Sequence, residues 1–186
     1  MPDVGIFLRD ASNTLLLEEY MKKLSLLDAA KFTSPNPLSL ICSRTPSGST
    51  NIATVSWWTY LSLEPETIGF AMMKTSYTGE MVRNSKNVVL TIPGEALAKQ
   101  VMQCGTSTGR TKDKAKDFGI ELQSIPECDI QIPVHSVIAM QCSLREFVDV
   151  GDHYLYICDV KNVYRNEEEK ALFAWKGYAK IAPVRD

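Results

Sequence analysis

The amino-acid sequence predicts a single mainly β domain with peripheral helices. Its 186 residues are 45% hydrophobic, which is enough apolar material for one buried core. After residue 30, most of the chain consists of short β-prone segments separated by Gly, Pro, Ser or Asn, a rhythm typical of a β-barrel or sandwich. A helical interlude and then a long hairpin follow these segments, and no repeat or linker indicates a second domain.

The first 30 residues read as an amphipathic helix. Ser12 can cap it, and apolar side chains recur at near-helical spacing. They are Leu15, Leu16, Leu17, Tyr20, Leu24 and Leu27. We therefore predict a helical extension over residues 1–30 and the folded domain over residues 31–186. Such a helix covers one end of a barrel, packs on a partner subunit, or serves as ordinary core cover.

The remaining elements follow in order along the chain. A turn cluster at residues 34–37 precedes the first strand, and a polar glycine loop at residues 105–109 joins the two helical segments. We predict strands at residues 38–43, 52–58, 67–73, 87–92, 134–148 and 153–164, and helical segments at residues 80–84, 94–100 and 112–118. The turn composition at residues 149–152 makes the last two strands a hairpin.

Charge and cysteine usage exclude several classes of partner. The 20 Lys and Arg balance 22 Asp and Glu to a net charge of −2, so no nucleic acid or acidic membrane surface is expected as a partner. No apolar run approaches the roughly 20 residues of a membrane helix, and the amino terminus has no signal core. Five widely spaced cysteines and two histidines indicate reduced thiols in the cytoplasm and no metal site.

Common catalytic and nucleotide motifs are absent. The sequence holds no G-x-S-x-G nucleophile motif, no G-x-G-x-x-G loop and no G-x-x-x-x-G-K-[ST] loop.

Two other segments are candidates for ligand binding. The strand at residues 51–57 carries the small residues Ala53 and Ser56, which would let a planar ring approach the backbone. Residues 74–79 gather a cation, hydroxyls and a phenol just before a helix, which is phosphate-site chemistry, although a helix cap and an ordinary strand explain them too.

The order of these segments resembles the flavin reductase-like family, whose fold is the FMN-binding split β-barrel. The resemblance spans about residues 30–182 and rests on the segments at residues 37–41, 51–57, 74–78, 87–93 and 151–153. It implies FMN lying across the strand at residues 51–57, with its phosphate near Lys74, Ser76 and Thr78. It also implies a cleft at a homodimer interface.

The resemblance implies a specific set of site residues. His153, in the element Gly151-Asp152-His153, is the candidate catalytic residue beside the nicotinamide, and a tight turn is the alternative explanation of that element. The implied cofactor-binding residues are Asn51, Ala53, Thr54, Val55, Ser56, Trp57, Lys74, Thr75, Ser76, Tyr77, Thr78, Gly105 and Thr106.

The implied function is that of an FMN-binding oxidoreductase, which transfers electrons from NAD(P)H through the flavin to an acceptor, as a flavin or ferric reductase does. Two alternatives stay open. The first is a flavoredoxin-type FMN electron carrier without direct use of NAD(P)H, which fits if the amino-terminal extension covers the nicotinamide face. The second is a non-catalytic barrel that has lost its flavin site.

Overall fold

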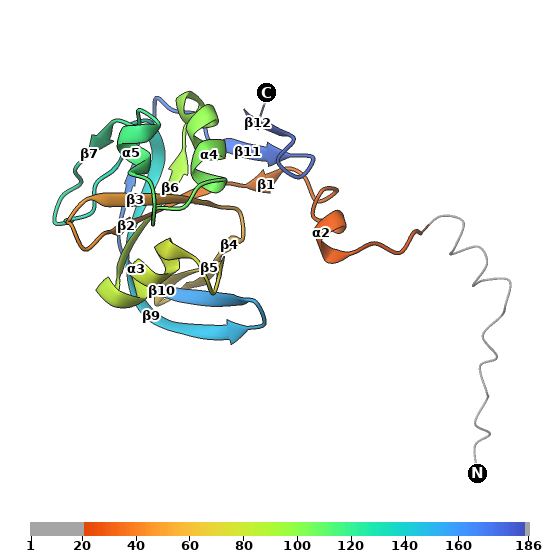
Figure 1. The fold of residues 1–186 in the computed structure, drawn as a ribbon, viewed down its shortest axis with the longest axis horizontal. Coiled ribbons are helices and arrows are strands. Elements are labelled where there is room, and N and C mark those ends of the chain that lie inside the picture. Colours follow the sequence, from red (N-terminus) through yellow and green to blue (C-terminus); the bar gives the residue numbers. More distant parts are fainter. Residues whose placement is uncertain (1–20, 185–186) are drawn as a thin grey trace, which may run out of the picture.

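A computed structural model describes residues 21–184 of the chain. Its main feature is a seven-stranded antiparallel sheet with the strand order β3-β2-β6-β9-β10-β5-β4 (Figure 1). These strands are β2 (Ser39–Arg44), β3 (Thr50–Val55), β4 (Trp58–Leu63), β5 (Glu66–Met73), β6 (Asn87–Pro93), β9 (Ser136–Val150) and β10 (His153–Arg165). The prediction of a mainly β fold with peripheral helices is confirmed.

Smaller elements complete the fold. One small sheet has the order β1-β11-β12, and β7 pairs with β8. These strands are β1 (Asn36–Pro37), β7 (Leu122–Gln123), β8 (Ile132–Pro133), β11 (Leu172–Trp175) and β12 (Lys180–Pro183). The helices are α2 (Leu26–Ala29), α3 (Tyr77–Ser85), η1 (Glu95–Leu97), α4 (Ala98–Gly105) and α5 (Lys114–Asp117). None of the helices in residues 21–184 is long and apolar enough to cross a bilayer.

The central strands are buried on both faces. Leu40 and Cys42 of β2 join a core beneath α4 and α5, whereas Ile41, between them, joins the core inside the barrel with α3. Figure 1 shows this arrangement, with α4 and α5 on one side of β2 and β3 and with α3, β5 and β10 on the other. Because successive side chains of a strand point to opposite faces, a strand between two cores is apolar almost throughout.

The chain passes from β3, at one edge of the sheet, to β4, at the other edge, through Ser56 and Trp57, so the two edges come together at this connection. The backbone N–H of Ala71 in β5 donates to the carbonyl of Trp57 over 2.8 Å, which extends the pairing of β4 with β5. On the same strand, Phe70 stacks on the fully buried Tyr156 of β10 with ring centroids 5.0 Å apart. No other strand lies along the outer edge of β3 in residues 21–184, so the barrel is open there.

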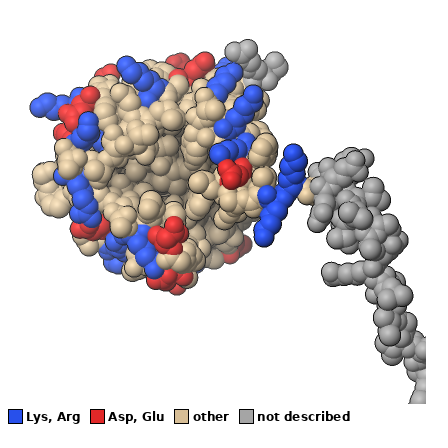
Figure 2. Space-filling view, turned by 45° about the vertical axis from the view of Figure 1, so that its right-hand side comes forward, with Lys and Arg blue, Asp and Glu red and all other residues tan. Residues whose placement is uncertain are grey.

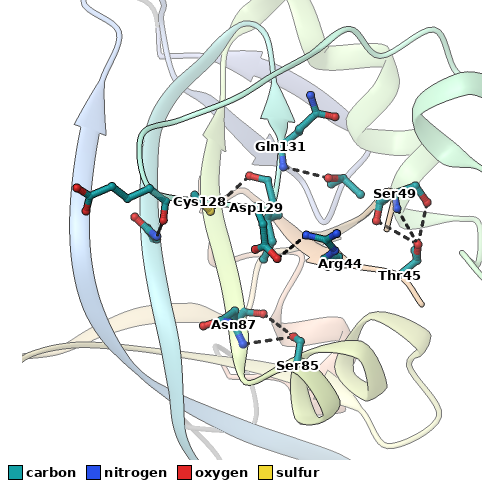
Figure 3. A network of polar contacts seen from close by, with 12 residues as sticks. Arg44, Thr45, Ser49, Ser85, Asn87, Cys128, Asp129 and Gln131 are labelled. Carbon is teal, nitrogen blue, oxygen red and sulfur yellow. Dashed lines mark hydrogen bonds and ion pairs between the residues drawn. The ribbon is translucent and has the colours of Figure 1, made fainter. Parts of the chain in front are cut away.

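Loops at the far end are tied by polar contacts (Figure 3). Arg44 at the end of β2 pairs with Asp129 over 2.5 Å, and the backbone N–H of Gln131 donates to the Thr50 hydroxyl over 3.1 Å. The Ser85 hydroxyl bonds both backbone groups of Asn87, where α3 turns into β6. These contacts fix the ends of β2, β3 and β6 on the side away from Trp57.

Over residues 21–30, the structure differs from the helix predicted for the first 30 residues. Residues 21–25 carry no regular structure, and only Leu26–Ala29 is helical, with Ser25 as its cap. The predictions for Ser12, Leu15, Leu16, Leu17 and Tyr20 lie outside the described residues. Two other boundaries are also corrected, because the strand predicted over residues 52–58 ends at Val55 and a separate strand, β4, begins at Trp58.

Candidate functional site

The site is a cavity of about 490 Å³ in the opening of the barrel. It is lined by the end of β3, the end of β5, the start of α3, the end of α4 and the loop after it. Figure 2 shows a face whose hollowed centre is uncharged, with acidic and basic side chains around its rim. Its lining follows the chain from Ala53 in β3 to Trp57 just after the strand, which spans about 13 Å in an extended backbone.

One end of the cavity, which we call the ring end, is built on Ser56 and Trp57. The indole of Trp57 lies 5.0 Å from the imidazole of His153, with 33° between the ring planes. The Nδ1 of His153 lies 2.7 Å from the Asp152 carboxylate, and this contact holds the pKa of Asp152 below its usual range. With Nδ1 engaged there, Nε2 is the ring nitrogen left to face a ligand.

The other end of the cavity, which we call the anion end, is built on the start of α3. Ser76 caps this helix by accepting from the Gly79 amide over 3.2 Å. The buried Asn51 donates its side-chain amide to the Thr78 hydroxyl over 2.7 Å, so the Thr78 proton stays free for another acceptor. A helix start with free N–H groups and hydroxyls attracts anions.

Lys114 adds a buried cation to the cavity wall. The side chain is 3% exposed, and its Nζ donates to the carbonyl of Cys104 over 2.9 Å. Within residues 21–184, no carboxylate lies within 4.0 Å of Nζ, and burial lowers the pKa of this lysine. Because a buried charge is costly when unpaired, this ammonium favours an anionic ligand.

The glycine loop approaches β3 very closely. A Cβ atom on Gly109 would lie 2.0 Å from the Asn51 Oδ1 and 2.8 Å from the Tyr77 ring, so only glycine fits there. Gly105 faces Thr54, whose hydroxyl donates to the Val101 carbonyl over 2.5 Å. The loop thereby forms a fixed wall of the anion end.

Lys74, which we predicted to hold a phosphate with Ser76 and Thr78, is not among the residues that line the cavity. Its Nζ pairs with Asp149 over 2.6 Å and lies 5.3 Å from the Tyr154 ring centroid, outside the cavity lining. The pKa of Lys74 is raised and that of Asp149 lowered, chiefly by this hydrogen bond. Glu80, near the same helix start, is neutralised by Arg110 over 2.5 Å.

The structure brings most of the other predicted residues together. Asn51 lies behind the lining, where it orients Thr78, and the Thr106 hydroxyl is turned to the Met102 carbonyl over 3.0 Å. The predicted residues that line the cavity are Ala53, Thr54, Val55, Ser56, Trp57, Thr75, Ser76, Tyr77, Thr78, Gly105 and His153.

Sequence reasoning missed three parts of the wall. Lys114 lies in the run 112–118, which we predicted as a helical segment without singling out this lysine. Tyr178, on the β11–β12 turn, reaches the Ser56 hydroxyl from 122 residues away. Leu27 and Ala30 also line the cavity. The single local signal was Gly177-Tyr178 after a strand, which reads only as a turn.

Comparison with known proteins decides the family. The flavin reductase-like domain matches residues 32–182, which is most of the chain. The chain belongs to the flavin reductase-like domain family. An uncharacterised protein of Pyrococcus abyssi is 28% identical over 121 residues, or 64% of this chain and 67% of that one. One from Archaeoglobus fulgidus is 23% identical over 120 residues, or 64% of this chain and 68% of that one.

Solved structures of this family share the fold. The flavoredoxin of Methanosarcina acetivorans superposes with a TM-score of 0.76 at 17% identity, covering 89% of this chain and 93% of that one. An FMN-binding protein from Thermus thermophilus, with bound 1-cyclohex-2-enone, gives 0.75 at 18%, covering 88% and 94%. The flavin reductase PheA2 gives 0.73 at 16%, covering 89% and 100%. The predicted split-barrel fold is confirmed.

The residues of this flavin reductase-like chain fit FMN. The volume lies in the range of cofactor pockets. Thr78 and the start of α3 offer hydrogen-bond donors at one end, and Lys114 in the cavity wall adds positive potential, as a phosphate requires. The small side chains of Ala53 in β3 and of Ser56 just after it leave room for a planar ring at the other end.

Proposed function

We propose that the protein is an FMN-binding oxidoreductase that takes electrons from NAD(P)H and passes them to an acceptor. The observation that carries the proposal is Lys114, a buried cation without a carboxylate partner in residues 21–184, in the wall of a cavity beside an open strand edge. The residues of the anion end would hold the phosphate, and those of the ring end would hold the isoalloxazine ring. The bound flavin supplies the hydride and electron chemistry.

The chain's own groups orient the ring. Because β3 is the last strand of its sheet, its outer edge presents backbone N–H and C=O groups that no other strand in residues 21–184 pairs. Such fixed donors match the polar edge of an isoalloxazine ring and favour negative charge on it after reduction. The indole of Trp57 covers part of the ring end.

His153 lines the cavity beside Trp57, and in this proposal it would border the approach of a nicotinamide. Asp152 fixes the Nδ1 side of the imidazole, and Trp57 restricts the rotation of the ring by lying against it. Nε2 is then positioned to hydrogen-bond a nicotinamide carboxamide stacked over the flavin. This role makes His153 the candidate catalytic residue.

A second candidate function is electron transfer without direct use of NAD(P)H. The observation in its favour is the wall of Leu27, Ala30 and Tyr178 beside the ring end. This wall occupies space that a dinucleotide needs if it is to stack on the flavin. Small oxidants, or the exposed redox group of a protein partner, reach the flavin edge with less room.

We further propose a homodimer. The strand β4 is an edge strand of the barrel and exposes Tyr60, Leu61 and Leu63 to solvent. An exposed edge strand with large apolar side chains is an association surface. Trp57 precedes this strand directly, so a partner there would border the ring end. Five free cysteines accord with a cytoplasmic protein.

Anaerobic reduction of the FMN-loaded protein separates the two functions. If it is a reductase, NADH or NADPH bleaches the flavin absorbance within seconds to minutes, as fast turnover requires. If it is an electron carrier, dithionite bleaches the flavin, whereas excess NADH and NADPH leave the spectrum unchanged.

A further inference from the structure

Tyr178 closes the ring end of the cavity from outside. It stands on the turn between β11 and β12, and its phenol lies against β3, where its hydroxyl is hydrogen-bonded to the Ser56 hydroxyl. Both residues line the cavity. Residues 39–55 and 172–183 belong to different sheets, so this contact is a bridge between the small sheet and the barrel opening.

The turn that carries Tyr178 has an unusual backbone. Lys176, Gly177 and Tyr178 all have positive φ values, of 51°, 61° and 71°. A lysine and a tyrosine adopt this left-handed region only where surrounding contacts compensate its cost. The conformation therefore depends on the contacts that hold the turn, and it directs the phenol to Ser56.

Segment 31–34 holds the turn from behind. The Lys176 amide donates to the Ser34 hydroxyl over 2.6 Å. Gly177 lies so close to Lys31 that a Cβ atom on it would be 2.7 Å from the Lys31 Cγ. The same segment continues into Ala30 and Leu27, which also line the cavity. Turn and segment form one continuous wall that ends in the phenol.

We propose that the Tyr178–Ser56 bond is a latch that makes FMN a retained cofactor, not a flavin exchanged at each turnover. The inference rests on the proposed function, because it places the ring beside Ser56. With the phenol on Ser56, the ring is enclosed between this wall and the β3 backbone and leaves only after the latch opens. Electrons must then pass to an acceptor that reaches the flavin in place, either a small oxidant or a protein redox group.

The test measures flavin release from the loaded protein. The anisotropy of flavin fluorescence follows dissociation after dilution, for FMN and for riboflavin, in the full chain. Loss of the latch bond in Tyr178→Phe or Ser56→Ala should speed release of both flavins by roughly threefold to tenfold. The double variant should release them no faster than the faster single variant, because both changes break one bond.

Two further variants test the contribution of the Tyr178 ring and provide a control on the same hairpin. Tyr178→Ala, which also removes the ring, should speed release by more than about tenfold. Lys180→Ala changes an exposed side chain of the same hairpin and should release both flavins at the rate of the unmodified protein. If Tyr178→Ala does not fold, Tyr178→Phe and Ser56→Ala still decide the matter.

The outcomes separate this inference from the proposed function. An unmodified protein that binds no flavin contradicts the proposed function itself. An unmodified protein that binds FMN, but releases it no more slowly than Tyr178→Phe and Ser56→Ala, contradicts the latch alone. Faster release of FMN with unchanged release of riboflavin would place Tyr178 at the phosphate and also overturn the latch.

Discussion

The Nζ of Lys114 lies 2.9 Å from the carbonyl oxygen of Cys104, inside a cavity whose lining residues offer it no carboxylate. This ammonium keeps two further N–H donors for a ligand. The chain contains 20 Lys and Arg, and the one that sequence reasoning placed at the phosphate, Lys74, is held by Asp149 instead.

Replacement of Lys114 should therefore separate FMN from riboflavin. A charge-assisted hydrogen bond contributes about 1.5–3 kcal/mol, so Lys114→Met should weaken FMN binding about tenfold to a hundredfold. Riboflavin, which lacks the phosphate, should bind with unchanged affinity, as titration by flavin fluorescence will show. Lys74→Ala is the matched control and should leave the affinity for both flavins unchanged. Equal losses for both flavins in Lys114→Met would show that this lysine supports only the fold.

FMN affinity should also fall as the pH rises. Burial holds the pKa of Lys114 below the ordinary 10.5, and a bound phosphate raises it again by favouring the ammonium. FMN binding then takes up a proton in the alkaline range below pH 10.5, so affinity declines as pH rises through the lowered pKa. The stability of the flavin-free protein should depend on pH in the opposite direction. The unfolded chain binds the Lys114 proton more tightly than the folded chain does, so the contribution of Lys114 to the free energy of unfolding rises with pH.

The pH effect is checked by titrating FMN and riboflavin between pH 7 and pH 10. FMN affinity should decline across that range, and riboflavin affinity should not. Lys114→Met should remove the difference between the two profiles. Parallel pH profiles for FMN and riboflavin in the unmodified protein would count against the assignment.

His153→Ala should raise the KM for NAD(P)H and leave FMN affinity unchanged. The imidazole orients a nicotinamide through one hydrogen bond, so the effect should be roughly tenfold at most. Steady-state kinetics and FMN titration on the same preparation check both parts. An unchanged KM and turnover would remove His153 from the donor site, and a loss of FMN affinity would make its contact with Trp57 structural.

The protein should be a dimer in solution. Covering the exposed Tyr60, Leu61 and Leu63 of β4 should bury on the order of 2,000 Å² in total if the dimer is obligate. Light scattering at micromolar concentration gives the mass, and Leu63→Glu should shift it toward the monomer. A monomer in the unmodified protein would contradict the proposal.

The sequence predicted those parts of the fold that depend on local pattern. The strands β5, β6 and β10 lie within one residue of their predicted limits, because apolar runs there are bounded by turn residues. The strand β4 was missed, since no turn signal separates Trp57 from Trp58. Local pattern also predicted a helix at residues 80–84, where α3 begins three residues earlier, at Tyr77, and ends one residue later, at Ser85.

Contacts between distant residues account for what was missed. Lys74 has a suitable sequence position for a phosphate, but Asp149, 75 residues later, holds it. Lys114 is surrounded in sequence by charged residues, and only packing against Cys104 reveals it as a buried group. The contact of Tyr178 with Ser56 depends on the position of the β11–β12 hairpin beside the barrel, which no local pattern encodes.

The visible absorption spectrum of the purified protein, recorded before and after titration with FMN, tests the central claim most directly. We expect flavin bands in the protein as isolated, or a shift of the added FMN bands that saturates at one FMN per chain. A colourless preparation that leaves the spectrum of added FMN unchanged would contradict the claim and would favour a barrel without a flavin site.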